Sequence, residues 1–135
     1  EKKEVLAYGL KQNEQGALMI PMYDAQMTIV GIQYISEDGS KKFLTGSKKS
    51  GSFFILGSEI LKSSDVVNYA EGYATAASYY ADFSQPVVVA FDAYNLSPVA
   101  EVMFEYFNDR MHKFIADNDP ESNTGEQERN EGAGR

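Results

Sequence analysis

The chain has 135 residues, of which 43% are hydrophobic and 24% are charged, so it can build the core of one domain and is not globally disordered. No apolar run approaches the ~18 residues of a membrane helix, and no charged and then apolar leader opens the chain, so we expect a cytoplasmic protein that does not bind membranes. The net charge of -8 would argue against nucleic-acid binding only if the charge were evenly distributed along the chain. Because the chain has no Cys and a single His, any metal must be held by oxygen atoms.

The first half of the chain predicts β-structure. Short runs rich in Ile, Val, Phe and Tyr, separated by turn signals, predict strands over 16–21, 28–34, 41–44 and 52–56. Asp38-Gly39 predicts a hairpin turn, because Gly tolerates the positive φ that such turns require. The basic loop GSKKSG lacks the spacing of a nucleoside-triphosphate loop, and we interpret it as a hairpin tip. Candidates for weak contacts to nucleic acid or nucleotide are Lys41, Lys42, Lys48 and Lys49.

The second half of the chain alternates between strands and helices. The pattern predicts strands over 65–70, 87–91 and 113–116, with helices over 75–80 and from Ser97 onward. The continuous apolar run VVVAF at 87–91 is typical of a strand that is buried on both faces of a parallel sheet. Ser97 and Pro98 predict the N-cap and first position of the following helix.

These elements predict an α/β fold. We expect a doubly wound, mostly parallel sheet flanked by helices and preceded by an antiparallel β-hairpin region. The predicted parts are a β-rich segment over 1–62, an α/β core over 63–119 and an acidic, disordered tail over 120–135. The chain begins without Met, the string EKKE is typical of a helix end, and a doubly wound sheet would normally continue, so we expect a fragment of a longer protein.

Acidic residues are concentrated in the second half. Residues 63–135 carry thirteen Asp and Glu against four Lys and Arg, whereas residues 1–62 carry seven against eight. Carboxylates follow three successive predicted strands, namely Glu71, Asp92 and the pair Asp117 and Asp119. Since ligands of open parallel sheets bind outside the carboxyl ends of the strands, we expect these acids to converge. Mg²⁺, for which Mn²⁺ can substitute, would relieve their repulsion, and the predicted chemistry is phosphoryl transfer.

Each of these residues also has a purely structural interpretation. The string DNDP at 117–120 is typical of an Asx turn, and Asp92 or Asn95 can cap the turn before the second helix. His112, which precedes the last predicted strand, is expected at the surface or in packing. The joint placement of acids at three strand ends is what favours a site.

Several runs resemble one known family. NYAEGYATAASYY, followed by PVVVAFDAYNLSPVA and KFIADND, is similar to the Toprim domain, most closely to the version in primases of conjugative plasmids and phages. The earlier runs GALMIPMYD, VGIQYISEDGSKKFLTG and GSFFILG resemble the segment that precedes the Toprim core in those primases. The resemblance covers roughly residues 8–126.

The resemblance implies a DNA primase, a nucleotidyltransferase that makes short RNA primers from nucleoside triphosphates on single-stranded DNA during replication. The family's glutamate falls on Glu71, in acid/base catalysis, and its aspartate pair falls on Asp117 and Asp119, which would hold Mg²⁺. Asp92 matches the FDAxNL segment and would be a further metal ligand or support one. Related primases have an upstream zinc-binding module, for which this chain has no Cys, so we expect that module or a helicase in the parent protein.

Three other functions were weighed against primase. A Toprim nuclease or topoisomerase would use the same acids, but the hairpin region before Glu71 favours primase and no Tyr stands out as a nucleophile. A non-catalytic domain that binds nucleotides or a partner would keep the fold without the activity. A receiver domain would need an acid pair after its first strand and a late Lys, and neither is present.

Overall fold

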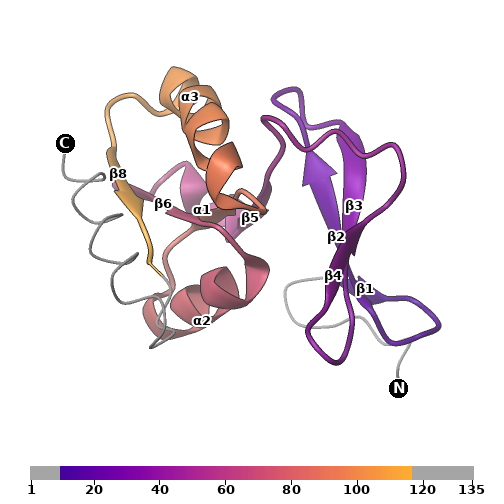
Figure 1. The fold of residues 1–135 in the computed structure, drawn as a ribbon. Coiled ribbons are helices and arrows are strands. Elements are labelled where there is room, and N and C mark those ends of the chain that lie inside the picture. The colour runs from indigo at the N-terminus through magenta and orange to yellow at the C-terminus, as the bar shows by residue number, and fades with distance from the viewer. Residues whose placement is uncertain (1–9, 117–135) are drawn as a thin grey trace. The chain divides into compact units, whose positions relative to one another are not determined.

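The computed structural model describes residues 10–116. The chain divides after Phe54 into two compact units, each with a sheet of its own (Figure 1). The predicted helix end at 1–4 and the predicted tail at 120–135 lie outside the described residues. The three-part division predicted from the sequence stays a prediction.

The first sheet is antiparallel, as expected. Its strands follow one another in the order β1 (Lys11–Gln12), β2 (Leu18–Tyr23), β3 (Ile29–Ile35) and β4 (Lys41–Phe43). β2 and β3 are aligned from Leu18 opposite Ile35 to Tyr23 opposite Ile29. Ile20 and Met22 alternate along β2 and are fully buried, so one face of this sheet carries the core of the unit.

The Asp38-Gly39 turn joins β3 to β4 as predicted. Gly39 has φ 89°, its N–H donates to the Ser36 carbonyl at 2.8 Å, and the Ser36 N–H donates to the Ser40 carbonyl at 2.8 Å. The Ser40 N–H donates to Asp38 Oδ1 at 2.9 Å, and this hydrogen bond lowers the pKa of the Asp38 carboxyl. The turn therefore fixes the register of β3 against β4.

The basic loop is not a hairpin tip, and that prediction was wrong. β4 pairs with β3, but the next strand, β5 (Phe54–Leu56), belongs to the second sheet. The loop instead continues along β3 beyond the end of β4. The Leu44 N–H donates to the Ile32 carbonyl at 2.9 Å, and the Lys48 N–H donates to the Val30 carbonyl at 3.0 Å. These bonds satisfy the edge of β3 that the short β4 leaves uncovered.

The second sheet has the order β5-β7-β6-β8. The elements are α1 (Ser58–Leu61), β6 (Val66–Ala70), α2 (Tyr73–Phe83), β7 (Val87–Val89), the short 3-10 helix η2 (Ala93–Asn95), α3 (Leu96–Tyr106) and β8 (Met111–Phe114). β6 pairs in parallel with both β7 and β8. The chain therefore has the expected mixed α/β character, and Figure 1 shows α2 and α3 on opposite sides of this sheet.

The apolar run VVVAF provides a strand inside the sheet, as its composition predicted, but β7 (Val87–Val89) ends two residues before the predicted strand of 87–91. β7 lies between β5 and β6, and Val87, Val88 and Val89 are completely buried. On one side, α2 packs against β6 and β7, and on the other α3 packs against β6 with Val99 buried. Burial on both faces explains why this run shows no alternation of polar and apolar residues.

The boundaries predicted for the last strand and for the start of the second helix were also wrong. The last strand is β8 (Met111–Phe114) and not 113–116, because Met111 already pairs with Val66 and the register then runs to Phe114 opposite Tyr69. The second helix is not capped by Ser97. Asn95 is the N-cap of α3, and η2 adds a turn before it, so Ser97 lies inside the helix. Hydrogen bonds formed by Asp92 and Asn95 start the helical turn earlier than the Ser-Pro signal indicated.

His112 is a packing residue, as expected. Its Nδ1 lies 2.7 Å from the hydroxyl of Tyr69, its Nε2 lies 2.8 Å from the Phe107 carbonyl, and its ring stacks on Phe104 with centroids 3.9 Å apart. Tyr69 is fully buried, and its burial raises the pKa of the phenol above the ordinary value. The Tyr69–His112 pair therefore ties the centre of β6 to the edge strand β8.

Tyr69→Phe should destabilise the protein at neutral pH and change its response to alkali. The variant loses the hydrogen bond to His112, at a cost of about 1 kcal/mol. In the wild type, the unfolded chain releases the Tyr69 proton near about pH 10 while the folded chain retains it, so the free energy of unfolding falls as the pH rises above that value. Urea titrations of both proteins at a series of pH values should show their difference shrinking above about pH 10. A constant difference would contradict this account.

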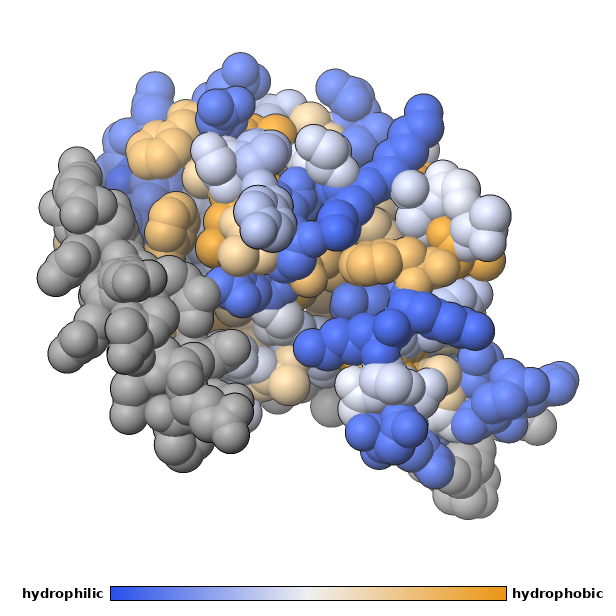
Figure 2. All heavy atoms as spheres, viewed as in Figure 1, coloured by the Kyte–Doolittle hydropathy of each residue, from blue (hydrophilic) through white to orange (hydrophobic). Residues whose placement is uncertain are grey.

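No helix within residues 10–116 is long and apolar enough to cross a membrane. In Figure 2, hydrophilic residues are spread over the face shown, with hydrophobic residues between them.

Candidate functional site

The carboxyl ends of β6, β7 and β8 form one edge of the second sheet, which we call the carboxyl edge. Ala70 at the end of β6 is aligned with Val89 at the end of β7, and Tyr69 is aligned with Phe114 at the end of β8. Beyond the strands, the Ala90 N–H donates to the Ala70 carbonyl at 2.9 Å. The three strands thus end at nearly the same level, which is the arrangement that the acid pattern required.

Glu71 stands at the middle of the carboxyl edge, because it directly follows the strand that lies between β7 and β8. It is half-buried. The next residue, Gly72, is the N-cap of α2 and has no side chain with which to cap the helix. The positive end of the helix dipole therefore lies beside Glu71, where it favours anions such as phosphate groups.

Asp92 lies at the same edge, after β7, and has a structural role. Its Oδ1 accepts a hydrogen bond from the Asn95 N–H at 2.9 Å, so it caps η2. This is the capping role that the sequence left open. The preceding residue, Phe91, has φ 80°, which is strained for a residue with a side chain, and such strain is often found at functional sites. A role of Asp92 in metal binding stays a prediction.

Asp117 and Asp119 lie outside the described residues. The structure shows the approach to them: the Ile115 N–H donates to the Tyr69 carbonyl at 2.7 Å, which extends the pairing of β8 with β6 beyond Phe114. Asp117 follows two residues after Ile115. The described part of the chain has no group of three or more His, Cys, Asp or Glu that could hold a metal ion. Within the described residues, this edge has two candidate carboxylates, Glu71 after β6 and Asp92 after the neighbouring strand β7.

This donor set suits Mg²⁺. Mg²⁺ is typically bound by one or two carboxylates and completes its shell with water and substrate phosphates, so it does not need a cage of three protein ligands. All candidate ligands are hard oxygen donors, and no Cys or second His is present to favour a softer metal. The metal assignment therefore depends on Asp117 and Asp119 joining the two acids that the structure describes.

The four candidate lysines lie in the first unit. Lys41 and Lys42 are exposed on β4, and successive side chains of a strand point to opposite faces, so these two do not form one patch. Lys49 lies over the ring of Phe43, 5.2 Å from its centroid, while Lys48 is exposed. Their contact to nucleic acid or nucleotide stays a prediction.

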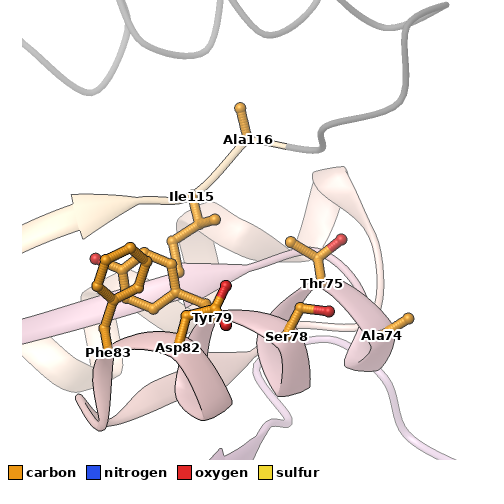
Figure 3. Close-up of a pocket in the computed structure, with 8 residues that line it drawn as sticks. All are labelled: Ala74, Thr75, Ser78, Tyr79, Asp82, Phe83, Ile115 and Ala116. Atoms are coloured by element: carbon orange, nitrogen blue, oxygen red, sulfur yellow. The ribbon is translucent and has the colours of Figure 1, made fainter.

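A groove lies between α2 and the residues that follow β8 (Figure 3). Its lining is Ala74, Thr75, Ser78, Tyr79, Asp82, Phe83, Ile115 and Ala116. In Figure 3, Thr75 and Ser78 lie on the α2 side and Ile115 lies on the facing segment. Among the lining residues that the structure describes, Asp82 is the only acid, so this part of the groove offers hydroxyl groups and apolar surface but no pair of carboxylates.

Tyr94 is a candidate site residue that was not predicted from the sequence. Its side chain is 93% exposed, although it belongs to the 3-10 helix that directly follows the carboxyl edge. The only sequence signal was an aromatic residue between the polar Asp92 and Asn95, and that pattern is equally typical of a half-buried turn.

No family model matches the chain. DNA primase TraC of Escherichia coli is 37% identical over 117 residues, which cover 86% of this chain and 11% of that protein. A second Escherichia coli DNA primase TraC is 38% identical over 101 residues, which cover 74% of this chain and 7% of that protein. The chain therefore spans only about a tenth of the length of the curated relatives it matches.

Solved structures show a similar fold. The primase fragment of the bacteriophage T7 primase-helicase protein superimposes with a TM-score of 0.52 at 19% identity, covering 90% of this chain and 52% of that chain. The RNA polymerase domain of Mycobacterium tuberculosis primase DnaG, in complex with double-stranded DNA, gives a TM-score of 0.52 at 15% identity, covering 88% and 44%. The chain is thus homologous to a segment of DNA primase TraC, and its fold is similar to those of phage and bacterial primase domains.

Proposed function

We propose that this chain is the Toprim part of a DNA primase, which synthesises short RNA primers on single-stranded DNA by Mg²⁺-dependent nucleotidyl transfer. The observation that carries the proposal is the 37% identity to DNA primase TraC over 117 residues. The carboxyl edge supports it, because Glu71 and Asp92 follow two neighbouring parallel strands there. The intact protein would act in the cytoplasm.

The proposed reaction joins two nucleotides. The 3′-hydroxyl oxygen of one nucleotide attacks the α-phosphate of a nucleoside triphosphate, a new P–O bond forms, the α–β phosphoanhydride bond breaks and pyrophosphate leaves. Glu71 would accept the proton of the attacking hydroxyl as a general base. The N-terminus of α2, which begins at Tyr73, would help to hold the triphosphate beside it.

Mg²⁺ held by Asp117 and Asp119, with Asp92 as a further ligand or support, would stabilise the negative charge that develops on the phosphates. These residues have the oxygen donors that the ion prefers. We also propose that a zinc-binding module or a helicase in the parent protein helps to present the template. The T7 structure belongs to a primase-helicase protein, and another similar chain comes from Aquifex aeolicus primase with its zinc-binding and RNA polymerase domains.

Asp117→Asn and Asp119→Asn should each weaken divalent-metal binding with little change in stability. Each substitution removes one negative charge from the proposed ligand pair. The measurement is a Mn²⁺ titration of the chain followed by NMR, in which a paramagnetic ion broadens the amides near it. We expect broadening around Glu71, Asp92 and 117–119 in the wild type and at least about tenfold more Mn²⁺ for the same effect in the variants.

Glu121→Gln is the matched control, because it removes an acid from the same segment outside the predicted pair. It should leave the titration unchanged. Equal loss in all three variants would mean that the ion responds only to the net charge of the segment. The function itself is tested with the full-length protein, single-stranded DNA, nucleoside triphosphates and Mg²⁺: labelled RNA primers are expected. Cleavage of the DNA would indicate the nuclease alternative, and nucleotide binding without any product would indicate a non-catalytic domain.

A further inference from the structure

Tyr94 is the most exposed large hydrophobic residue in the described part of the chain. Its side chain is 93% exposed, and the next in order, Met111, is 64% exposed. A tyrosine that projects this far into solvent buries almost none of its ring, so it adds little to the stability of the fold. Its position needs another explanation.

The backbone that carries Tyr94 is held in place from both sides. Asp92 accepts the Asn95 N–H at 2.9 Å, and the Asn95 side-chain Nδ2 donates to the Ala90 carbonyl at 2.8 Å. Asn95 is only 3% exposed, and α3 continues directly from it. Phe91, which is 7% exposed, keeps a positive φ of 80° at the start of the turn. The ring of Tyr94 is thus presented on a rigid turn and retains only its own side-chain rotations.

This turn is part of the carboxyl edge. Tyr94 is two residues after Asp92, and the strand before it, β7, pairs with β6, which ends next to Glu71. A nucleotide whose phosphates lay at this edge would have its base beside the loops and turns that follow the strands. Bases stack on aromatic rings whatever their sequence, because every base has a π-face.

We propose that Tyr94 is a stacking platform for a nucleobase at the carboxyl edge. This inference rests on the proposed function and adds a binding residue to it. The base belongs either to a nucleoside triphosphate or to the single-stranded template, and the two sources share the chemistry of a flat aromatic ring. Held on a rigid turn, the Tyr94 ring loses little conformational freedom when the base binds.

The chain contains no Trp, so Tyr94→Trp places a single indole at this position. Its fluorescence should be quenched on addition of a nucleoside triphosphate, of a short single-stranded oligothymidylate, or of both. Quenching by the triphosphate would identify the base of a nucleotide substrate, and quenching by the oligothymidylate would identify a template base. The matched control is Tyr106→Trp: Tyr106 is 60% exposed but lies at the opposite end of α3 from the carboxyl edge. No quenching is expected there. Equal quenching at both positions would overturn the inference.

Affinity provides the second measurement. Tyr94→Ala should weaken binding of the quenching ligand by about tenfold or more, whereas Tyr94→Phe should bind within about twofold of the wild type, because the ring is retained. If Tyr94→Ala binds as tightly as the wild type, the inference is wrong while the proposed function stands. If the wild type binds neither ligand, the inference is wrong as well. Primer synthesis by the full-length protein tests the proposed function separately.

Discussion

Glu71→Gln should lower primer synthesis by the full-length protein at least about 100-fold while leaving the fold intact. General acid–base catalysis contributes typically 10² to 10⁴-fold, and a glutamine amide of nearly the same size cannot accept the proton of the attacking 3′-hydroxyl. Glu71 is half-buried and lies just after the last residue of β6, where a glutamine of nearly the same size can take its place. The measurement is the rate of labelled primer formation at saturating nucleoside triphosphate, with circular dichroism to check the fold.

Asp82→Asn is the matched control for this prediction. Asp82 is exposed and lies near the C-terminal end of α2, whereas Glu71 precedes its start, so the same loss of charge is placed at the opposite edge of the sheet. Its activity should stay within about twofold of the wild type. Normal primer synthesis by Glu71→Gln would remove this residue from the catalytic role. A similar loss in both variants would show that the effect comes from net charge.

The elements that were predicted well are those whose surroundings in the fold determine which types of residue they contain. The run at 87–91 has no polar alternation because β7 lies between two strands and all three of its residues are completely buried. Once parallel pairing was inferred, the level of the strand ends followed, and with it the common edge that Glu71 and Asp92 share. The Asp38-Gly39 turn was predictable because its requirement for positive φ is local.

Features that depend on register or on partners far away in the chain were not predictable. β1 is two polar residues long and exists only because Lys11 and Gln12 pair with β2. The loop after β4 resembled a hairpin tip, but the strand that follows it pairs elsewhere. β8 begins two residues earlier than its composition indicated, because its register is set by β6.

The candidate site also has a part that was predictable from the sequence and a part that was not. An acid after a strand can be found in a sequence, but whether Asp92 also caps a turn depends on the Asn95 N–H reaching its Oδ1. The exposure of Tyr94 is likewise a property of the folded turn, because Asn95 is buried and holds the Ala90 carbonyl while its neighbour projects outward. The residue types that could take part in a site were therefore predictable from the sequence. Their hydrogen bonds and their exposure in the folded protein were not.

Arg110 connects the segment before β6 to the start of β8. Its Nη1 donates to the Leu61 and Ser64 carbonyls at 2.9 and 2.6 Å, and its Nη2 donates to the Lys62 carbonyl at 2.8 Å. The side chain is only 19% exposed, and its guanidinium carbon lies 5.0 Å from the ring centroid of Phe107. One guanidinium thus binds three carbonyls of the segment that runs from the end of α1 to the start of β6.

Arg110→Met should lower the free energy of unfolding by about 2–4 kcal/mol, because it removes three charge-assisted hydrogen bonds, two of which are part-buried. Urea denaturation followed by circular dichroism gives this value directly. Arg110→Lys should recover only part of it, since an ammonium group cannot match the planar fork that reaches three carbonyls. Lys113→Met is the control: Lys113 makes one long bond of 3.3 Å to the Tyr79 hydroxyl, and its loss should cost under about 0.5 kcal/mol.

A loss in Arg110→Met no larger than in the control would mean that water satisfies the three carbonyls equally well. The expected large loss would mean that Arg110 fixes where β6 and β8 begin. The backbone carbonyl of Asp65 accepts the Met111 N–H at 3.0 Å directly beside this cluster, so the register of both strands starts there. Because that register also decides where the strands end, Arg110 would control, from the opposite edge of the sheet, how Glu71 and the acids after β8 are aligned. Arg110→Met should then broaden the NMR signals of the carboxyl edge even under conditions where the variant is folded.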